Sequence, residues 1–297
     1  MSDQKQITMD TQHTDSLHDL QFDYYGTKLA TCSSDHTVKV FSVPDQVLLD
    51  TLCGHQGPVW AVAWAHPRFG DLLATASYDT RAIVWKKQQD SSKYTPTHAV
   101  QHGASVNSVA WGPQEFGAVL ATASSDGTVR IVSFRDGMWP EVKLGSAHPM
   151  GSMAVSFCPF VSFNEGPVLA SGGCDCSLRL WSLREGQWVA LRAAFTEHTD
   201  WVRDVAFSPD ITLGIVLASC AQDKTVIVRR RDVSKLTTTG AWETSTTVLP
   251  TAVWRLSWSS CGTQLVATTA DSEAFLLERS ALFTDPWKVS PLRELAQ

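Results

Sequence analysis

The sequence predicts an all-β fold, a propeller of six blades with four strands each, and three observations carry this prediction. A short apolar strand that closes on an aromatic residue recurs six times, ending at Phe22, Trp64, Trp111, Phe157, Phe207 and Trp258. A second apolar strand follows each time and leads to an Asp, at Asp35, Asp79, Asp126, Asp175, Asp223 and Asp271. Successive members of this Asp series lie 44 to 49 positions apart, which is close to the period of four-stranded propeller blades.

The repeats can be placed along the whole chain. Five of them begin at a His, and the sixth has Leu249 instead. We place them at about 13–54, 55–101, 102–147, 148–197, 198–248 and 249–297, in one domain spanning 1–297 with a tail over 1–12. The first strands are short β-branched and aromatic runs without helical periodicity, such as Val59–Trp64, Val106–Trp111 and Val202–Phe207. A Trp opens the outer strand in four repeats, at Trp139, Trp188, Trp242 and Trp287.

Composition and charge exclude several classes of protein. The formal net charge is −6, the wrong sign for a nucleic-acid-binding surface. We expect no signal peptide, because residues 1–15 are polar, and no membrane span, because no apolar run approaches eighteen residues. The seven Cys form no framework spacing, which favours a reducing compartment.

Strand counting indicates one surplus strand at the N-terminus. The sixth repeat has its own outer strand near Trp287, yet Ile7, Thr8, Met9, Asp10 and Thr11 also lie where an outer strand belongs. An unpaired strand edge is usually covered, so we expect another chain to supply the three inner strands beside it. Two alternatives stay open: the segment pairs as a fifth strand on the sixth blade, or it is disordered.

Five segments carry a family resemblance. They are YYGTKLATCSSD at 24–35, GHQGPVWAVAWAHP at 54–67, SVNSVAW at 105–111, SGGCD at 171–175 and DWVRDVA at 200–206. They closely resemble the Sec-thirteen family of WD-repeat proteins, and the resemblance extends over essentially the whole chain. It implies a six-bladed open β-propeller whose seventh blade is inserted by a partner. The paralogous Seh-one proteins use the same device. The sixth repeat departs from the pattern, with Leu277 where a Trp is usual.

The resemblance also implies a function. Members of the family are scaffolds shared by the COPII vesicle coat, in endoplasmic reticulum to Golgi transport, and the nuclear pore complex. The blade donor would be the large COPII outer-coat subunit, at the cytoplasmic face of endoplasmic reticulum exit sites and vesicles, or an α-helical nucleoporin of the Y-shaped subcomplex. A lysosome-associated signalling complex is a further setting. Membrane association would be peripheral, through the coat only.

The predicted partner-binding residues are the surplus strand and the inner strands of the first and last repeats. Leu17, Leu20 and Phe22 would flank the opening on one side, and Val253, Leu256 and Trp258 on the other. An obligate joint of this kind would bury on the order of 2,000 Å² or more.

A catalytic interpretation competes with a structural one. His55, Ser77, Asp79 and Trp85 have the spacing of the WD-repeat structural tetrad, in which Asp accepts from His, and His bonds toward Ser and Trp. A nucleophilic triad uses the same residue types, but a catalytic constellation needs to occur only once. Here the elements recur in degraded form, and we expect only the second repeat to have all four. We therefore predict no catalytic residue, metal or cofactor.

Three other features receive structural interpretations. Cys174 and Cys176 lack the second ligand pair that zinc needs. The basic run 229–231 is expected on a solvated outer edge, without nucleic-acid binding. Trp60, Trp201 and Trp254 stand at loop-to-strand junctions on one rim, where a cation cage is the alternative to packing. A different class of function, a closed-ring adaptor that binds a short or modified peptide on its top face, stays open.

Overall fold

The computed structural model describes residues 9–145, 147–159, 166–191, 194–210, 212, 214–232, 242–279 and 287–292. The chain divides into two compact units, Met1–Gln101 and His102–Gln297. The division falls where the third repeat is predicted to begin, so each unit holds whole repeats. The single domain over 1–297 stays a prediction.

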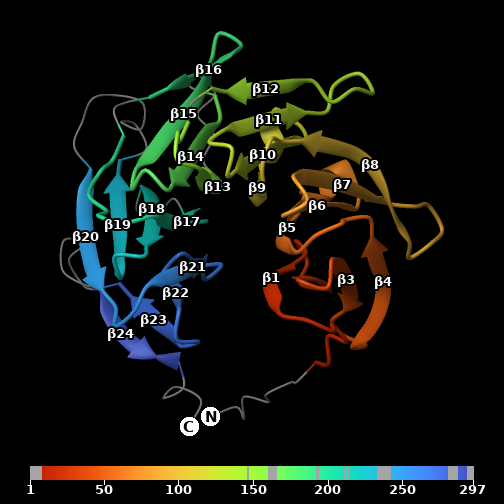
Figure 1. Ribbon diagram of the computed structural model, residues 1–297, viewed down its shortest axis with the longest axis horizontal. Helices are drawn as coiled ribbons and strands as arrows, with labels where there is room; N and C mark the ends of the chain where they lie inside the picture. Colours follow the sequence, from red (N-terminus) through yellow and green to blue (C-terminus); the bar gives the residue numbers. More distant parts are fainter. Residues whose placement is uncertain are drawn as a thin grey trace. The chain divides into compact units, whose positions relative to one another are not determined.

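Unit 1 consists of two four-stranded antiparallel sheets, the first and second blades (Figure 1). The strands of the first blade are β1 (Leu17–Phe22), β2 (Lys28–Ser33), β3 (Thr37–Ser42) and β4 (Val47–Cys53). Those of the second are β5 (Val59–Trp64), β6 (Leu72–Ser77), β7 (Arg81–Lys87) and β8 (Tyr94–Gln101). A short 3-10 helix, η1 (Pro67–Phe69), connects β5 to β6.

Unit 2 contains four further blades of the same kind, each with its strands in chain order. The third blade has β9 (Val106–Trp111), β10 (Val119–Ser124), β11 (Val129–Ser133) and β12 (Glu141–Leu144), with η2 (Gln114–Phe116) after β9. The fourth has β13 (Ser152–Phe157), β14 (Val168–Gly173), β15 (Leu178–Arg184) and β16 (Gln187–Ala190). The fifth has β17 (Val202–Phe207), β18 (Ile215–Ala221), β19 (Thr225–Arg231) and β20 (Glu243–Val248). The sixth has β21 (Val253–Trp258), β22 (Gln264–Thr269), β23 (Ala274–Glu278) and β24 (Lys288–Pro291).

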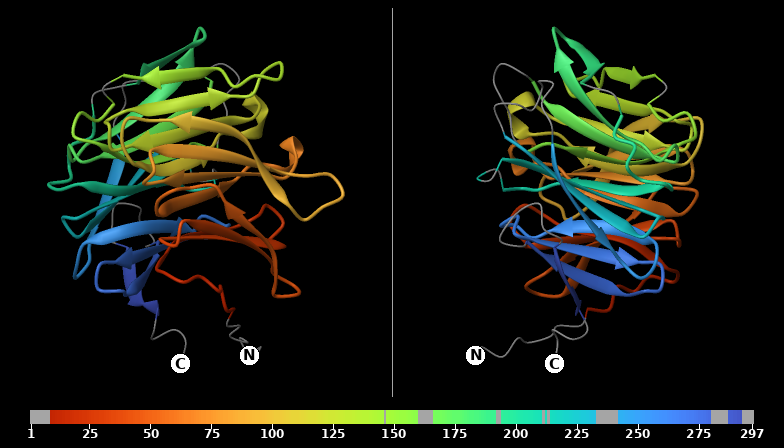
Figure 2. Two further views of the ribbon diagram at one scale, coloured as in Figure 1. Left: turned by 45° about the vertical axis from the view of Figure 1, so that its right-hand side comes forward. Right: turned by 90° about the vertical axis from the view of Figure 1, so that its left-hand side faces the viewer.

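The prediction of an all-β fold with six four-stranded blades is confirmed. The strands over Val59–Trp64, Val106–Trp111 and Val202–Phe207 lie where the sequence places them. Figure 2 shows that the sheets are twisted, as strands of L-residues require.

The hydrophobic core lies between successive blades. In unit 1, residues of the first blade such as Val38 and Val40 pack with Val62 and Trp85 of the second. In unit 2, one apolar cluster joins the third and fourth blades, another the fourth and fifth, and another the fifth and sixth. The first strands β9, β13, β17 and β21 are consecutive neighbours. Within unit 2, a blade with neighbours on both sides therefore buries both faces of its sheet, which explains why β14 and β18 are buried at every position.

Candidate functional site: histidine networks and uncovered blade faces

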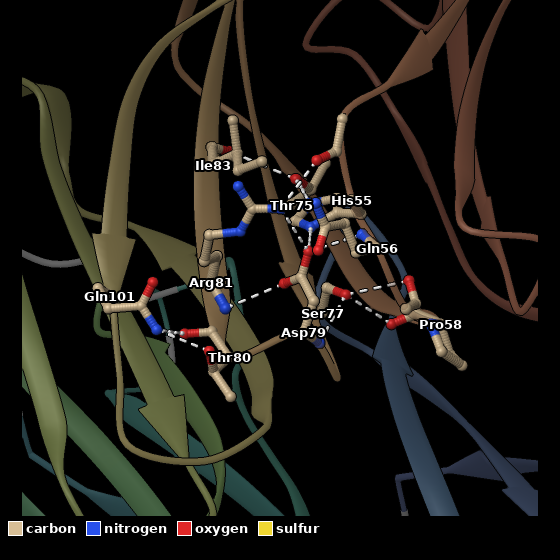
Figure 3. Close-up of polar contacts among 12 residues, drawn as sticks. His55, Gln56, Pro58, Thr75, Ser77, Asp79, Thr80, Arg81, Ile83 and Gln101 are labelled. Carbon is tan, nitrogen blue, oxygen red and sulfur yellow. Dashed lines mark hydrogen bonds and ion pairs between the residues drawn. The ribbon is translucent and has the colours of Figure 1, made fainter.

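A buried hydrogen-bond network ties the loop before β5 to the turn after β6 (Figure 3). His55 Nδ1 lies 2.9 Å from Asp79 Oδ2, and His55 Nε2 lies 2.7 Å from Thr75 Oγ1. The indole Nε1 of Trp85 donates to the same Thr75 hydroxyl at 2.9 Å. Asp79 also accepts from the backbone N–H of Gln56 at 2.9 Å. The carboxylate therefore fixes both the histidine ring and the loop that carries it.

The prediction that Ser77 is the hydroxyl of this network is wrong, because Thr75 takes that place. The two side chains face the same side of β6, since they are two residues apart on one strand. Ser77 stands at the end of the strand, where its hydroxyl lies 3.1 Å from the carbonyl of Gly57 and 2.9 Å from that of Pro58 (Figure 3). It also accepts from the N–H of Asp79 at 3.1 Å. Ser77 thus supports the turn rather than the histidine.

The fourth blade also has a complete network, so the prediction that only the second repeat has one is wrong. His148 Nδ1 lies 2.8 Å from Asp175 Oδ1, and His148 Nε2 lies 2.8 Å from Ser171 Oγ. Trp181 Nε1 donates to Ser171 at 2.9 Å. The hydroxyl again lies two residues before the equivalent of Ser77, which in this blade is Gly173.

In the fifth blade a buried arginine replaces the tryptophan. Arg229 donates to Ser219 Oγ at 2.8 Å and to Glu197 Oε2 at 3.1 Å, and its guanidinium lies 5.0 Å from the ring centre of Phe195. The prediction of a solvated edge for 229–231 is therefore wrong for Arg229 and Arg231, which are both buried. Alternation along β19 turns these two side chains to the same, covered face, where Arg231 lies against the ring of Trp242.

These networks are unsuited to nucleophilic catalysis. The hydroxyls bound to the histidines, Thr75, Ser171 and Ser219 among them, are fully buried, so a substrate has no access to them. The carboxylates are held ionised: burial alone would raise the pKa of Asp79, but hydrogen bonds from His55, Gln56 and Arg81 outweigh it and keep this pKa well below its usual range. What the networks do is fix loops to sheets.

The third blade holds its histidine neutral. Burial lowers the pKa of His102 to about 4, and this effect outweighs the opposing charge of Asp126. Burial also lowers the pKa of His198 in the fifth blade. In the unfolded chain a histidine has a pKa of about 6.5, so below that pH the unfolded state takes up protons that these imidazoles in the folded state do not.

We therefore predict that thermal stability falls as the pH drops from about 6.5 toward 4, because protonation favours the unfolded chain over this window. Melting temperatures measured by circular dichroism should decline progressively across it. In His102→Gln the decline should be shallower, although the melting temperature at neutral pH is lower. His36→Gln, at an exposed histidine, is the matched control and should keep the wild-type slope. An equal slope in all three proteins would contradict the assignment to His102.

The inner strand of the first blade has an uncovered apolar face. Leu20 in β1 is 56% exposed, whereas the residues at the same register in β5, β13, β17 and β21 are 3% to 9% exposed. Those four residues are Val62, Val155, Val205 and Leu256. Phe22 is 52% exposed, and Leu17 also belongs to this exposed set. A preceding blade buries these positions elsewhere, and among the described residues nothing buries them in the first blade.

Neighbouring blades are also joined by hydrogen bonds from one inner strand to the next. Asp19 Oδ2 accepts from the N–H of Val62 at 3.1 Å, and Asp204 Oδ2, at the same register in the fifth blade, accepts from the N–H of Leu256 at 2.9 Å. Gln21, Ser108 and Ser156 make equivalent bonds to Trp64, Val155 and Phe207. Each of these four joints within the units therefore combines apolar burial with at least one side-chain oxygen offered by the preceding blade.

The sixth blade is uncovered on a different surface from the one predicted. Val253 and Leu256 are buried, and Trp258 packs against the same cluster, with its Nε1 donating to the carbonyl of Ala206 at 3.1 Å. These three residues thus face the fifth blade. The residues on the opposite face include the cross-strand pair Val266 and Leu276, which are only partly buried. Their equivalents in the fifth blade, Ala218 and Val228, are buried against the sixth.

The described residues of the predicted surplus N-terminal strand do not form a strand. Met9, Asp10 and Thr11 take no strand conformation, and Ile7 and Thr8 lie outside the described residues. The sheet of the sixth blade consists of β21 to β24, so the described residues add no fifth strand to it. A strand needs a partner for its backbone groups, and the pairing of this segment with another chain stays a prediction.

Cys174 and Cys176 are the remaining candidate ligands. All seven cysteines are free thiols, with Cys174 buried and Cys176 partly buried. Within the described ranges, no group of three or more His, Cys, Asp or Glu residues is placed to hold a metal ion. No helix among the same residues has the length and apolarity needed to cross a membrane.

Comparison with known families places this architecture. The family described as "WD domain, G-beta repeat" matches residues 4–42, 46–86, 94–133, 142–182 and 190–229, more than half of the chain. Together with the six four-stranded sheets and the His–Asp networks, this match defines a WD-repeat β-propeller.

Curated relatives narrow the class further. A protein of Emericella nidulans is 39% identical over 91% of this chain and 93% of its own length. Relatives from Mycosarcoma maydis (37% identical; 93% of this chain and 92% of the relative) and Yarrowia lipolytica (36%; 95% and 97%) are equally extensive. All three are described as protein transport protein sec13. The chain belongs to the Sec13 family.

Proposed function

We propose that this protein is a non-catalytic structural scaffold of vesicle-mediated protein transport, and that a partner supplies a β-sheet to cover the inner strand of its first blade. The observation that carries the proposal is the exposure of Leu20 and Phe22, at register positions that a preceding blade buries elsewhere. Curated relatives named as protein transport proteins support the setting.

The joints within the chain define the chemistry of the proposed partner. The N–H of Trp64 donates to Gln21 of the preceding blade at 2.6 Å, and Phe22 has the same register position in β1. A docking strand would therefore place a side-chain oxygen where the backbone N–H of Phe22 can donate to it. It would also pack apolar side chains against Leu20. The family resemblance implies an open ring whose opening would be flanked by the first and last blades of the chain. On the last blade, the free apolar surface is the partly buried pair Val266 and Leu276.

The family resemblance supplies the proposed partners and locations. We propose the large COPII outer-coat subunit as blade donor, at the cytoplasmic face of endoplasmic reticulum exit sites and vesicles. An α-helical nucleoporin of the Y-shaped nuclear pore subcomplex is the second proposed donor, and a lysosome-associated signalling complex is a further setting. Attachment to membranes would pass through the coat. The absence of catalysis is part of the proposal and is supported by the burial of the histidine-bound hydroxyls.

The proposal is tested by purifying the tagged chain from cells and identifying what remains bound after high-salt washing. We expect one large partner in stoichiometric amount, because an apolar joint resists salt. Deleting residues 1–12 should lower its recovery about tenfold if one or two net hydrogen bonds and their packing are lost, with the far-ultraviolet circular dichroism unchanged. A tagged chain that behaves as a monomer and captures only short peptides would instead support the closed-ring adaptor. Melting of the isolated truncated protein would show that this segment stabilises the chain internally.

A further inference from the structure

Each first strand contains one bulged residue at the same place. The pairing of the first two strands skips a single residue in every blade: His18, Trp60, Asn107, Met153, Arg203 and Trp254. A bulge leaves its residue unpaired and redirects the side chain, and bulges are frequent next to binding sites. The six bulged side chains are therefore the positions where this fold is free to place binding groups.

Several bulged residues are hydrogen-bonded locally. His18 Nε2 lies 2.6 Å from the hydroxyl of Ser34. Asn107 donates to Ser125 at 2.8 Å and to the carbonyl of Ser152 at 2.9 Å. Their polar atoms are thus used within the protein, which leaves them little capacity for a ligand.

Arg203 differs from these residues. Over the described part of the chain its guanidinium forms no hydrogen bond or ion pair, and its Nε is buried without a partner. Burial lowers the pKa of Arg203 from its ordinary value, yet a guanidinium remains charged in a protein. The buried Nε thus lacks a hydrogen-bond acceptor, and an anion bound to the guanidinium would stabilise this charge.

Two tryptophans hold this guanidinium in place. It lies 4.4 Å from the ring centre of Trp254 and 5.3 Å from that of Trp201, distances at which a cation is attracted to an indole face. Trp201 and Trp254 are 40% and 46% exposed. The pair of aromatic rings therefore forms accessible walls beside a fixed cation.

One carboxylate lies near Arg203. Asp200 accepts from the backbone N–H of Trp201 at 2.7 Å, and its negative charge acts on Arg203. A polyanion such as nucleic acid would therefore be repelled, as the net charge of −6 also implies. A single planar monoanion matches the guanidinium fork best.

We propose that Arg203, with Trp201 and Trp254 as walls, is a binding site for a carboxylate side chain of an acidic peptide segment. The guanidinium donates to the two carboxylate oxygens, and the indoles pack against the aliphatic part of the acidic residue and its neighbours. The site lies within unit 2 and does not depend on the proposed blade-donating partner.

The probe for the test is a fluorescein-labelled, C-terminally amidated decapeptide of glycine and serine with three interspersed glutamates. We expect it to bind the full chain, measured by fluorescence anisotropy, with a Kd on the order of 0.1–1 mM. A glutamine-for-glutamate version should not bind. A glutamine version with a free C-terminus carries only a terminal carboxylate. We expect the glutamate peptide, which carries side-chain carboxylates, to bind more tightly than this version.

Variants assign the binding to Arg203. Arg203→Gln should weaken binding of the glutamate peptide about tenfold or more, because charge-assisted hydrogen bonds are lost. Trp254→Ala should weaken it by a smaller factor and serves as the second variant if Arg203→Gln folds poorly. Arg179→Gln removes the same charge at an arginine that already lies beside Asp175, and it should bind like the wild type. Equal binding by Arg203→Gln and the wild type, or equal binding of the glutamate and glutamine peptides, would overturn the proposal.

Discussion

Replacing both Leu20 and Phe22 by Asp is expected to lower capture of the proposed blade-donating partner by more than about 100-fold, because two apolar side chains worth roughly 1.5–3 kcal/mol each on burial are lost and charges enter the joint. Both side chains are more than half exposed, so the isolated protein loses little packing. Its melting temperature should change little, and its tendency to associate with itself should fall.

The matched control is Val47→Asp. Val47 is 53% exposed and lies on β4, the outer strand of the same blade. The variant Val47→Asp introduces one negative charge, the same as each substitution of the double variant, on a surface where the proposal places no partner. Partner recovery, measured by quantitative mass spectrometry of the purified complex, should stay at the wild-type level in this variant. A similar loss of partner recovery in Val47→Asp and in the double variant would show that the first-blade face is not the docking surface.

Asp79→Ala is expected to lower the free energy of unfolding by about 1–3 kcal/mol or more, since buried polar groups lose their acceptor. The replaced carboxylate receives bonds from His55, from the N–H of Gln56, and from Arg81. Thr75→Val should also destabilise, because His55 and Trp85 share that hydroxyl. Denaturant unfolding measures both changes.

The sixth blade provides the control for this second prediction. Asp271 stands at the same position but bonds Thr251 and Thr269, because the histidine is replaced by Leu249. Asp271→Ala should therefore cost less than Asp79→Ala. The pair Asp79→Ala and His55→Ala should be strongly non-additive, as members of one network are. Additive losses, or a cost for Asp271→Ala as large as that for Asp79→Ala, would contradict the network.

Period and pattern were enough to predict the blades, because every blade repeats a first strand of six residues and an Asp after the second strand. The wrong hydroxyl in the second blade arose because Ser77 and Thr75 are both small, hydroxylated and on one face of β6. Strand alternation permits either, and only the distance to His55 separates them. The arginine at 229 was misread for a related reason, since a charged residue gives no sign in the sequence that Glu197 and Ser219 accept its donors.

The uncovered faces show a second limit. Leu20 and Leu256 have the same register position, and sequence equivalence suggested that both flank the opening. They differ because a sheet has two faces: the fifth blade covers Leu256, while no blade precedes Leu20 in the chain. The free surface of the last blade therefore lies on alternate residues of β22 and β23, such as Val266. In the fifth blade the residues at the equivalent positions are buried against the sixth blade. Comparing the two blades therefore identifies the free surface of the last blade.

The exposed strand of the first blade also affects how cells control the abundance of this protein. A chain without the proposed partner would display leucine and phenylalanine on an exposed strand, and chaperones and proteases recognise such surfaces. Copies made in excess of the partner would be removed, while bound copies would persist. The abundance of the protein would then follow that of its partner, and stoichiometry in the assembly would be set by degradation rather than by matched synthesis.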